Sequence, residues 1–345
     1  MTLGATMVAS LVAILARPLT WPLALTAFLL RGGLVVVVAP IVVLPSAVGL
    51  ANVLGPAVTR IALGGTVQAI AQIVVGAIGL GLIWLVSLGS LAAAAEAETV
   101  RQVAVEEGLT LIPDPTIDPH LPPSRLVRRI VVIRSLAMLP LLLVLAWAVL
   151  SLIAATYREL TIPSRLDAPL VERVISGVPL ALMAVAIAWM LSQSVAAVAV
   201  RATVLVGSDV RDSIRFAVRL VIRRPGAVVV AFALPSAVLG LVVLLAGVAG
   251  AAGWSSVRAA LTGGTPNFSD ALAVLGFVAL WLAGLGLISV VAAWRGAVWT
   301  TLVADIVGTI GATRDGRPAD WPRDRVSGTL ASLRPGEADP RRGEP

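Results

Sequence analysis

The sequence predicts an all-α, polytopic integral membrane protein: a bundle of about six transmembrane helices with an interfacial amphipathic helix at 208–224. Two features of the composition support this class. The mean hydropathy is +0.98, and only 13% of the residues are charged, whereas charged residues make up about a quarter of a soluble domain. A third observation is that several apolar segments reach the roughly 20 residues that a helix needs to cross a bilayer.

The N-terminal segment 1–31 contains two apolar runs, 3–16 and 18–30. Each run is short for a spanning helix, so we expect interfacial or re-entrant helices, with Trp21 as an anchor at the membrane surface. A secretory signal peptide has basic residues ahead of its apolar region. The first arginine, Arg17, follows the first run, and we therefore expect this segment to remain in the mature protein.

The central segment 32–311 is predicted to hold the transmembrane domain. Its apolar stretches are bounded by charges or turn residues. A proline-rich connector, "IPDPTIDPHLPPS", separates the second stretch from the third. The last segment, 312–345, is rich in Arg, Asp, Pro and Gly and is predicted to be a disordered cytoplasmic tail. The predicted spans are 33–55, 66–95, 126–156, 174–200, 226–252 and 270–300.

The orientation follows from the arginines, because loops on the cytoplasmic side of a membrane carry an excess of basic residues. All 26 basic residues are arginine, and 21 of them lie on the side of the termini when six spans are counted. We therefore predict a multi-pass protein of the cell (cytoplasmic) membrane with both termini in the cytoplasm.

The segment 208–224 has the pattern of a helix that lies in the cytoplasmic interface. Ser208 is a suitable N-cap, Asp209 and Asp212 occupy the first turn, and Pro225 ends the regular pattern. One face carries an apolar stripe of Val210, Ile214, Ala217 and Val221. Another face, about 120° wide, carries four arginines at a spacing of four. These arginines are predicted to contact the anionic headgroups of membrane lipids: Arg211, Arg215, Arg219 and Arg223.

Two other functions for the same arginines are disfavoured. A voltage sensor carries its cations inside a spanning helix, whereas these arginines precede the predicted span. A surface that binds nucleic acid combines basic and aromatic side chains, and Phe216 is the only aromatic residue in the segment. No nucleic-acid partner is therefore predicted.

Polar residues inside spans are few, and they are the candidate functional residues. Ser192, Gln193 and Ser194 form a possible intramembrane polar patch in the fourth span. Such side chains bridge neighbouring helices or line the path of a solute, and both roles remain open.

Ionisable residues also lie near the ends of spans. Glu96 and Glu98 are predicted to form a local ion pair with Arg101 where the second span leaves the membrane. Arg134 and Arg295 are expected to extend to the interface. Asp305 is expected to cap the last helix or to pair with a loop arginine.

The residue types make catalysis an unpromising hypothesis. The chain has no Cys and a single His, His120, which leaves no thiolate or imidazole cluster for a metal. The acidic residues of 96–118 are interleaved with prolines and lack metal-ligand spacing, and no glycine-rich loop opens a helix after a strand. We predict no catalytic, cofactor-binding or metal-binding residue, no cofactor, and no enzymatic activity.

Two segments carry a resemblance to a family. "AVRATVLVGSDVRDSIRFAVRLVIRRPGAVVV" is a span followed by a basic helix and another span, and "AAWRGAVWTTLVAD" ends the last span. Over about 150–306 the chain resembles six-span bacterial membrane proteins related to the membrane domain of glycerophosphoryl diester phosphodiesterases. The resemblance implies a membrane module. It carries over no catalytic residue, because the 34-residue tail cannot hold a catalytic barrel of about 250 residues.

These observations predict a non-enzymatic scaffold or partner subunit, which would bind another membrane protein. The alternative is a transporter or permease for a small solute or lipid, which would use the polar patch of the fourth span. The position of Gln193 separates the two hypotheses, because a transporter requires that side chain to face a cavity and a scaffold requires it to contact a neighbouring helix.

Overall fold

The computed structural model describes residues 3–39, 41, 67–106, 123–162, 164, 167–262 and 268–312. Within these residues the chain is helical and contains no strand, which confirms the predicted all-α class. The chain divides into two compact units, Met1–Val303 and Ala304–Pro345. Of the second unit, the structure describes the end of the last helix. The predicted tail, apart from Ala312, lies outside the described residues. So does the predicted connector at 112–124, apart from its last two residues, Pro123 and Ser124, which begin a helix.

The N-terminal segment forms a short helix followed by a longer, kinked one. The first is α1 (Leu3–Leu15). The second comprises α2 (Thr20–Phe28), the π-helical turn η1 (Leu29–Gly33) and α3 (Leu34–Val38). Together these three elements give a candidate span at Thr20–Val38. The sequence had placed the first span at 33–55, most of which lies outside the described residues.

Most of the remaining helices are long. Because an α-helix rises about 1.5 Å per residue, the 39 residues of α6 extend about 58 Å, well beyond the roughly 30 Å hydrocarbon core of a bilayer. Five of these helices are long and apolar enough to cross a membrane, which brings the number of candidate spans in the described residues to six. The bounds are α5 (Val67–Glu106), α6 (Pro123–Thr161), α7 (Leu170–Ser176), α8 (Pro179–Val206), α9 (Val210–Arg223), α10 (Pro225–Thr262) and α11 (Phe268–Ala312).

Several of these bounds differ from the sequence-based expectation. Helices α5, α10 and α11 end ten or more residues beyond the predicted ends at 95, 252 and 300. The fourth span was expected to start at 174, but α7 ends at Ser176 and α8 begins at Pro179, since proline is favoured in the first turn of a helix. The amphipathic helix begins at Val210, and its N-cap is Asp209 in an extended conformation. The expected cap, Ser208, instead shares a hydrogen bond with Ser213 at 2.5 Å.

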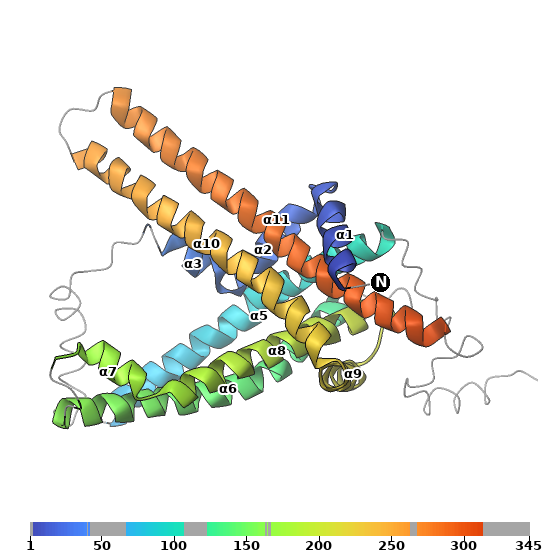
Figure 1. Ribbon diagram of the computed structural model, residues 1–345, viewed down its shortest axis with the longest axis horizontal. Coiled ribbons are helices and arrows are strands. Elements are labelled where there is room, and N and C mark those ends of the chain that lie inside the picture. The colour runs from blue at the N-terminus through green and yellow to red at the C-terminus, as the bar shows by residue number, and fades with distance from the viewer. Residues whose placement is uncertain are drawn as a thin grey trace, which may run out of the picture. The chain divides into compact units, whose positions relative to one another are not determined.

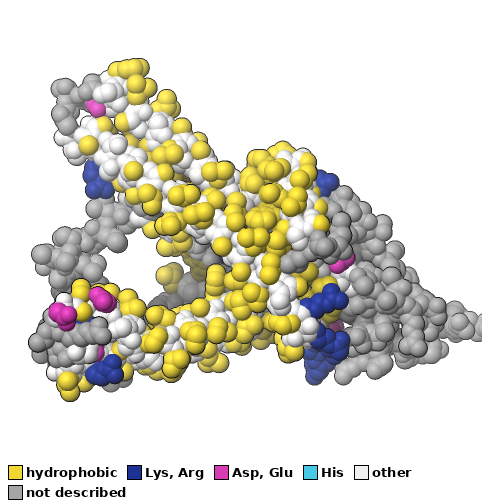
Figure 2. All heavy atoms as spheres, in the orientation of Figure 1, with side chains coloured by type: hydrophobic (Ala, Val, Ile, Leu, Met, Phe, Trp, Pro, Cys, Tyr) yellow, Lys and Arg dark blue, Asp and Glu magenta, His cyan; other side chains and the backbone are white. Residues whose placement is uncertain are grey.

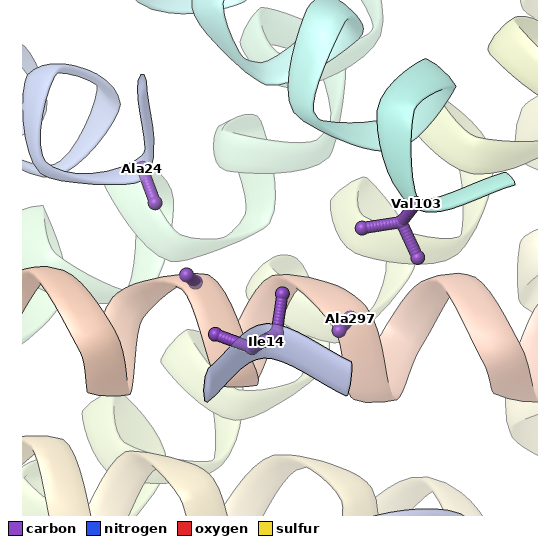
Figure 3. Close-up of a cluster of buried hydrophobic side chains, with 5 residues drawn as sticks. Ile14, Ala24, Val103 and Ala297 are labelled. Carbon is purple, nitrogen blue, oxygen red and sulfur yellow. The ribbon is translucent and has the colours of Figure 1, made fainter. Parts of the chain in front are cut away.

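The core of the first unit joins helices that are distant in sequence. α8 packs along α6, α5 contacts both α2 and α6, and α9 packs against α8 (Figure 1). Where α1, α2, α5 and α11 meet, Ile14, Ala24, Val103 and Ala297 form a buried cluster (Figure 3). The partly buried Trp21 packs against this cluster and donates its indole N–H to the carbonyl of Ile14 at 2.9 Å.

Helices α10 and α11 approach each other closely at glycines. A Cβ atom added to Gly284 would lie 3.1 Å from the Cβ of Ala246, and one added to Gly253 would lie 3.1 Å from the ring of Phe277. The ring of Trp254 packs against Phe277 with 5.6 Å between centroids. Glycines at these two positions therefore permit the close contact of the two helices.

Most of the described surface is apolar. Hydrophobic side chains cover the helices along their length, and basic side chains gather over α9 (Figure 2). On α6, large hydrophobic side chains such as Leu143 and Leu150 are exposed. A soluble protein rarely exposes so much contiguous apolar surface, whereas lipid tails solvate it in a bilayer.

Candidate functional site

The most polar part of the interior is built around Glu96, near the C-terminal end of α5. Its side chain is only 8% exposed, and three arginines from three other elements reach it. Burying a carboxylate is costly unless charged partners and hydrogen bonds compensate for the lost hydration. We use the name arginine cluster for Arg31, Arg134, Arg201 and Arg295 together with Glu96.

Arg134 of α6 makes the closest set of contacts with the carboxylate. Its Nε donates to Oε2 of Glu96 at 3.0 Å, and its Nη2 lies 2.6 Å from Oε1. This two-point contact uses the planar fork of the guanidinium group, which matches the geometry of a carboxylate. Arg134 was expected to extend to the interface; it instead joins α6 to α5.

Arg31 reaches Glu96 because the helix containing it is distorted. Within η1, Arg31 and Gly32 leave the helical conformation, and Gly32 has φ 104°. A residue with a side chain is strained at this angle, whereas glycine adopts it readily. The Nη2 of Arg31 lies 2.5 Å from Oε2 of Glu96 and 3.3 Å from the carbonyl oxygen of Ala92. The side chain of Arg31 is 31% exposed and forms the open edge of the cluster.

Arg201 of α8 is the most buried of the three arginines that contact Glu96, with a side chain that is 5% exposed. Its Nη1 donates to the carbonyl of Ala197 at 2.9 Å and lies 3.4 Å from Oε1 of Glu96. Its Nη2 donates to the carbonyl of Gly296 at 3.1 Å. The buried Nε of Arg201 has no hydrogen-bond partner among the described residues.

Arg295 of α11 is the residue before Gly296, which places it beside Arg201. It is near enough for its charge to act on Glu96 and on Arg134. The guanidinium carbon of Arg295 lies 5.6 Å from the ring centroid of Phe232, which is within the range of a cation–π contact. Among the described residues no carboxylate forms an ion pair with Arg295.

The cluster therefore holds four positive charges and one negative charge. Three of the four arginines contact the carboxylate directly, from η1, α6 and α8. The arrangement ties these elements to α5 through charge-assisted hydrogen bonds, which are about twice as strong as neutral ones. It also leaves an excess of positive charge among these helices.

The sequence had associated Glu96 and Glu98 with a local partner, Arg101. That assignment was wrong for Glu96, whose partners are 38 to 105 positions away in the chain. Glu98 is exposed and accepts a hydrogen bond from Gln102 at 3.1 Å. Sequence reasoning missed Arg31 and Arg201 as site residues. The available signal was that both arginines adjoin apolar segments, where an unpaired cation is costly.

The predicted polar patch of the fourth span lies on α8. The side-chain amide of Gln193 lies 3.8 Å from the sulfur of Met138 on α6. The hydroxyl groups of Ser192 and Ser194 are buried and have no hydrogen-bond partner among the described residues. Gln193 thus contacts a neighbouring helix, while the two serines are left without polar contacts.

The four arginines predicted to contact lipid headgroups, Arg211, Arg215, Arg219 and Arg223, are all exposed on α9. The opposite face of α9 packs on the protein through three buried residues, Ser213, Ala217 and Leu220. Ser213 shares a hydrogen bond with Thr203 of α8 at 2.7 Å. The predicted apolar stripe is only partly buried at Val210, Ile214 and Val221, because Ala217 is the one member of the stripe that also lies on the buried face.

A second buried carboxylate, Glu159, lies at the other end of α6 and has a local role. Its Oε2 accepts hydrogen bonds from the backbone N–H and the hydroxyl of Ser164, both at 2.9 Å. Arg173 of α7 lies 3.7 Å away. These contacts join Glu159 at the end of α6 to Ser164 and to α7. No group of three or more potential metal ligands occurs in the part of the chain that the structure describes.

The fold and the buried charges define the class of this chain: a multi-pass, all-α membrane protein with six helices able to cross a bilayer. No family model matches the chain, and neither a curated protein nor a solved structure matches it.

Proposed function

We propose that this chain is a non-enzymatic protein of the cytoplasmic membrane that acts as a scaffold or partner subunit for another membrane protein. The observation that carries the proposal is the contact of Gln193 with Met138 of the neighbouring helix. Glutamine at the lining of a solute path would face a water-filled cavity. A glutamine that contacts a thioether of the next helix contributes instead to the packing of a fixed bundle.

The long apolar faces of α10 support the same proposal. Four large side chains on its outer surface are more than half exposed, and they recur at the spacing of one helical face. Such a face packs against lipid or against a second transmembrane helix. These residues are Leu241, Leu244, Leu245 and Val248.

The proposal can be tested by site-specific photocrosslinking in intact membranes. A photoreactive amino acid at Leu244 should give one discrete protein adduct, because a partner would cover this position. The same probe at Leu239, which is 7% exposed, is the matched control, and it should react only within the chain. Native mass spectrometry with retained lipids should then show a second protein in fixed ratio to the 35.4 kDa chain. Lipid adducts alone at Leu244 would count against the proposal.

A second candidate function, transport of an anionic solute or lipid, is favoured by one observation: the positive excess of the arginine cluster. Transport would require an anion to pass the cluster. In liposomes that contain the full chain, flux of an anion that falls with Arg201→Gln but not with Arg258→Gln would favour this second function.

A further inference from the structure

The charge of the arginine cluster is not balanced within the described residues. Glu96 offers one negative charge to three contacting arginines, and Arg295 adds a fourth positive charge beside Gly296. Removing cations from water costs several kcal/mol per ion unless counter-charges are present. An anion beside the cluster would supply the missing negative charge.

Donors in the cluster remain available for such an anion. A guanidinium group has five N–H donors, and the buried Nε of Arg201 is without a partner. Arg295 is held by the ring of Phe232 and makes no ion pair within the described residues. Arg31 completes the edge, since its side chain is the most exposed of the three that contact Glu96. The recorded buried nitrogen without a partner in the cluster is thus Nε of Arg201, and the accessible edge of the cluster lies at Arg31.

We propose that the arginine cluster is a binding site for a phosphate-bearing anion, held by Arg31, Arg201 and Arg295, while Arg134 neutralises Glu96. Guanidinium groups bind phosphate oxygens through paired, parallel hydrogen bonds, which makes arginine the preferred residue for this chemistry. The site goes beyond the scaffold function, because a scaffold would need no ligand of this kind.

Two sources of the phosphate are compatible with the position of the cluster. Glu96 lies ten residues before the end of α5 at Glu106, which corresponds to about 15 Å along the helix. Arg201 lies five residues before the end of α8, on the side where α9 follows. A lipid headgroup drawn slightly inward would reach Arg31, and so would a free phosphate ion from the aqueous side.

The test uses the full chain, purified in a maltoside detergent and stripped of lipid. Its thermal unfolding is followed by the fluorescence of its nine tryptophans. One arm adds dioleoylphosphatidylglycerol, with dioleoylglycerol as the control that has the same acyl chains and no phosphate. The other arm adds sodium phosphate, with sodium chloride at equal ionic strength as its control. Native mass spectrometry counts the bound molecules.

We expect the midpoint of unfolding to rise with one phosphate-bearing probe and not with its control, because a ligand that binds the folded state stabilises it. A rise with the lipid alone identifies a headgroup site, and a rise with sodium phosphate identifies a site for the free ion. One molecule should bind per chain. Arg201→Gln and Arg295→Gln should each raise the dissociation constant about tenfold or more, the effect of losing one charge-assisted hydrogen bond.

Two control variants separate the cluster from other basic surfaces. Arg258→Gln removes an exposed guanidinium from α10, and Arg125→Gln removes one from the exposed first turn of α6. Neither should change the dissociation constant of the one bound molecule. Arg295→Gln breaks no ion pair within the described residues, so we expect this variant to fold. It therefore tests anion binding even if Arg201→Gln does not fold. Unchanged affinity in Arg295→Gln, or no shift with either phosphate-bearing probe, would overturn the proposal.

Discussion

Arg134 of α6 forms a two-point salt bridge with Glu96 of α5, with Nε 3.0 Å from Oε2 and Nη2 2.6 Å from Oε1. This pair joins two candidate spans that are separated in the chain by the proline-rich connector at 112–124. Arg31 and Arg201 bind the same carboxylate from two further elements. Glu96 is thus the point where four separate parts of the chain are held together.

Replacing Glu96 by glutamine should destabilise the protein strongly. The change leaves three arginines clustered without their carboxylate, and breaking a buried ion pair costs about 3–5 kcal/mol. The free energy of unfolding, measured in mixed micelles by titration with a denaturing detergent, should fall by that amount. Glu98→Gln is the matched control, because Glu98 is exposed on the same helix, and its effect should stay within about 0.5 kcal/mol. Equal stability of the two variants would contradict the role assigned to Glu96.

Replacing Gly32 by alanine should strain η1. Alanine at φ 104° is disfavoured by about 1–2 kcal/mol, and relief of the strain would move Arg31 away from Glu96. Gly240→Ala is the control, since a Cβ atom there meets nothing within 4 Å and alanine is favoured over glycine within a helix. We expect Gly32→Ala to lower the unfolding midpoint and Gly240→Ala to leave it unchanged or raise it. A lowered unfolding midpoint in both variants would show that backbone strain at Gly32 does not explain the loss of stability.

The contact between α10 and α11 should depend on Gly284. Leucine at this position would collide with Ala246, because even a Cβ atom lies 3.1 Å from the Cβ of that residue. Overpacking of this kind costs about 1–3 kcal/mol. Gly286→Leu introduces the same side chain two residues away, where a Cβ atom meets nothing within 4 Å, and it should be tolerated. The measurement is the midpoint of thermal unfolding for each variant, and equal midpoints would argue against close packing at Gly284.

The polar patch of α8 should contribute little to stability. Gln193→Leu removes one contact with Met138, and interhelical polar contacts in membranes average about 0.6 kcal/mol. Ser194→Ala removes a buried hydroxyl group that has no partner among the described residues, so this variant should be neutral or more stable. The free energy of unfolding checks both. A loss above about 2 kcal/mol in Ser194→Ala would indicate that the hydroxyl group has a partner that these contacts do not include.

The proposed orientation can be tested by labelling single cysteines, because the chain contains no Cys. A membrane-impermeant maleimide should label Arg215→Cys in inside-out vesicles only, since α9 is proposed to face the cytoplasm. It should label Arg258→Cys, at the far end of α10, in right-side-out vesicles only. Both positions are exposed. Labelling of both cysteines from the same side would contradict the arrangement of α10 as a span.

The sequence by itself determined the membrane class and the basic helix at Val210–Arg223. Five predicted spans start within about five residues of a long helix, but α5, α10 and α11 end ten or more residues beyond the predicted ends at 95, 252 and 300. Hydropathy and helical periodicity are local properties, so a window of neighbouring residues contains the information they need. The kinked candidate span at Thr20–Val38 was not predicted. Its two apolar runs are interrupted by Arg31 and Gly32, and the sequence does not reveal that Arg31 has a buried partner.

Only the tertiary structure decided which residues meet inside the bundle. Arg31, Glu96, Arg134 and Arg201 lie far apart in the chain, and their meeting depends on the order and rotation of the packed helices. The rotation of each helix also decided that Gln193 contacts Met138 and that Ser213, Ala217 and Leu220 form the buried face of α9. An apolar helix has no strong sequence signal for its rotation, because lipid tails and apolar side chains solvate its surface almost equally well. The buried ion pairs and the close contacts at glycine instead fix how each helix is rotated against its neighbours.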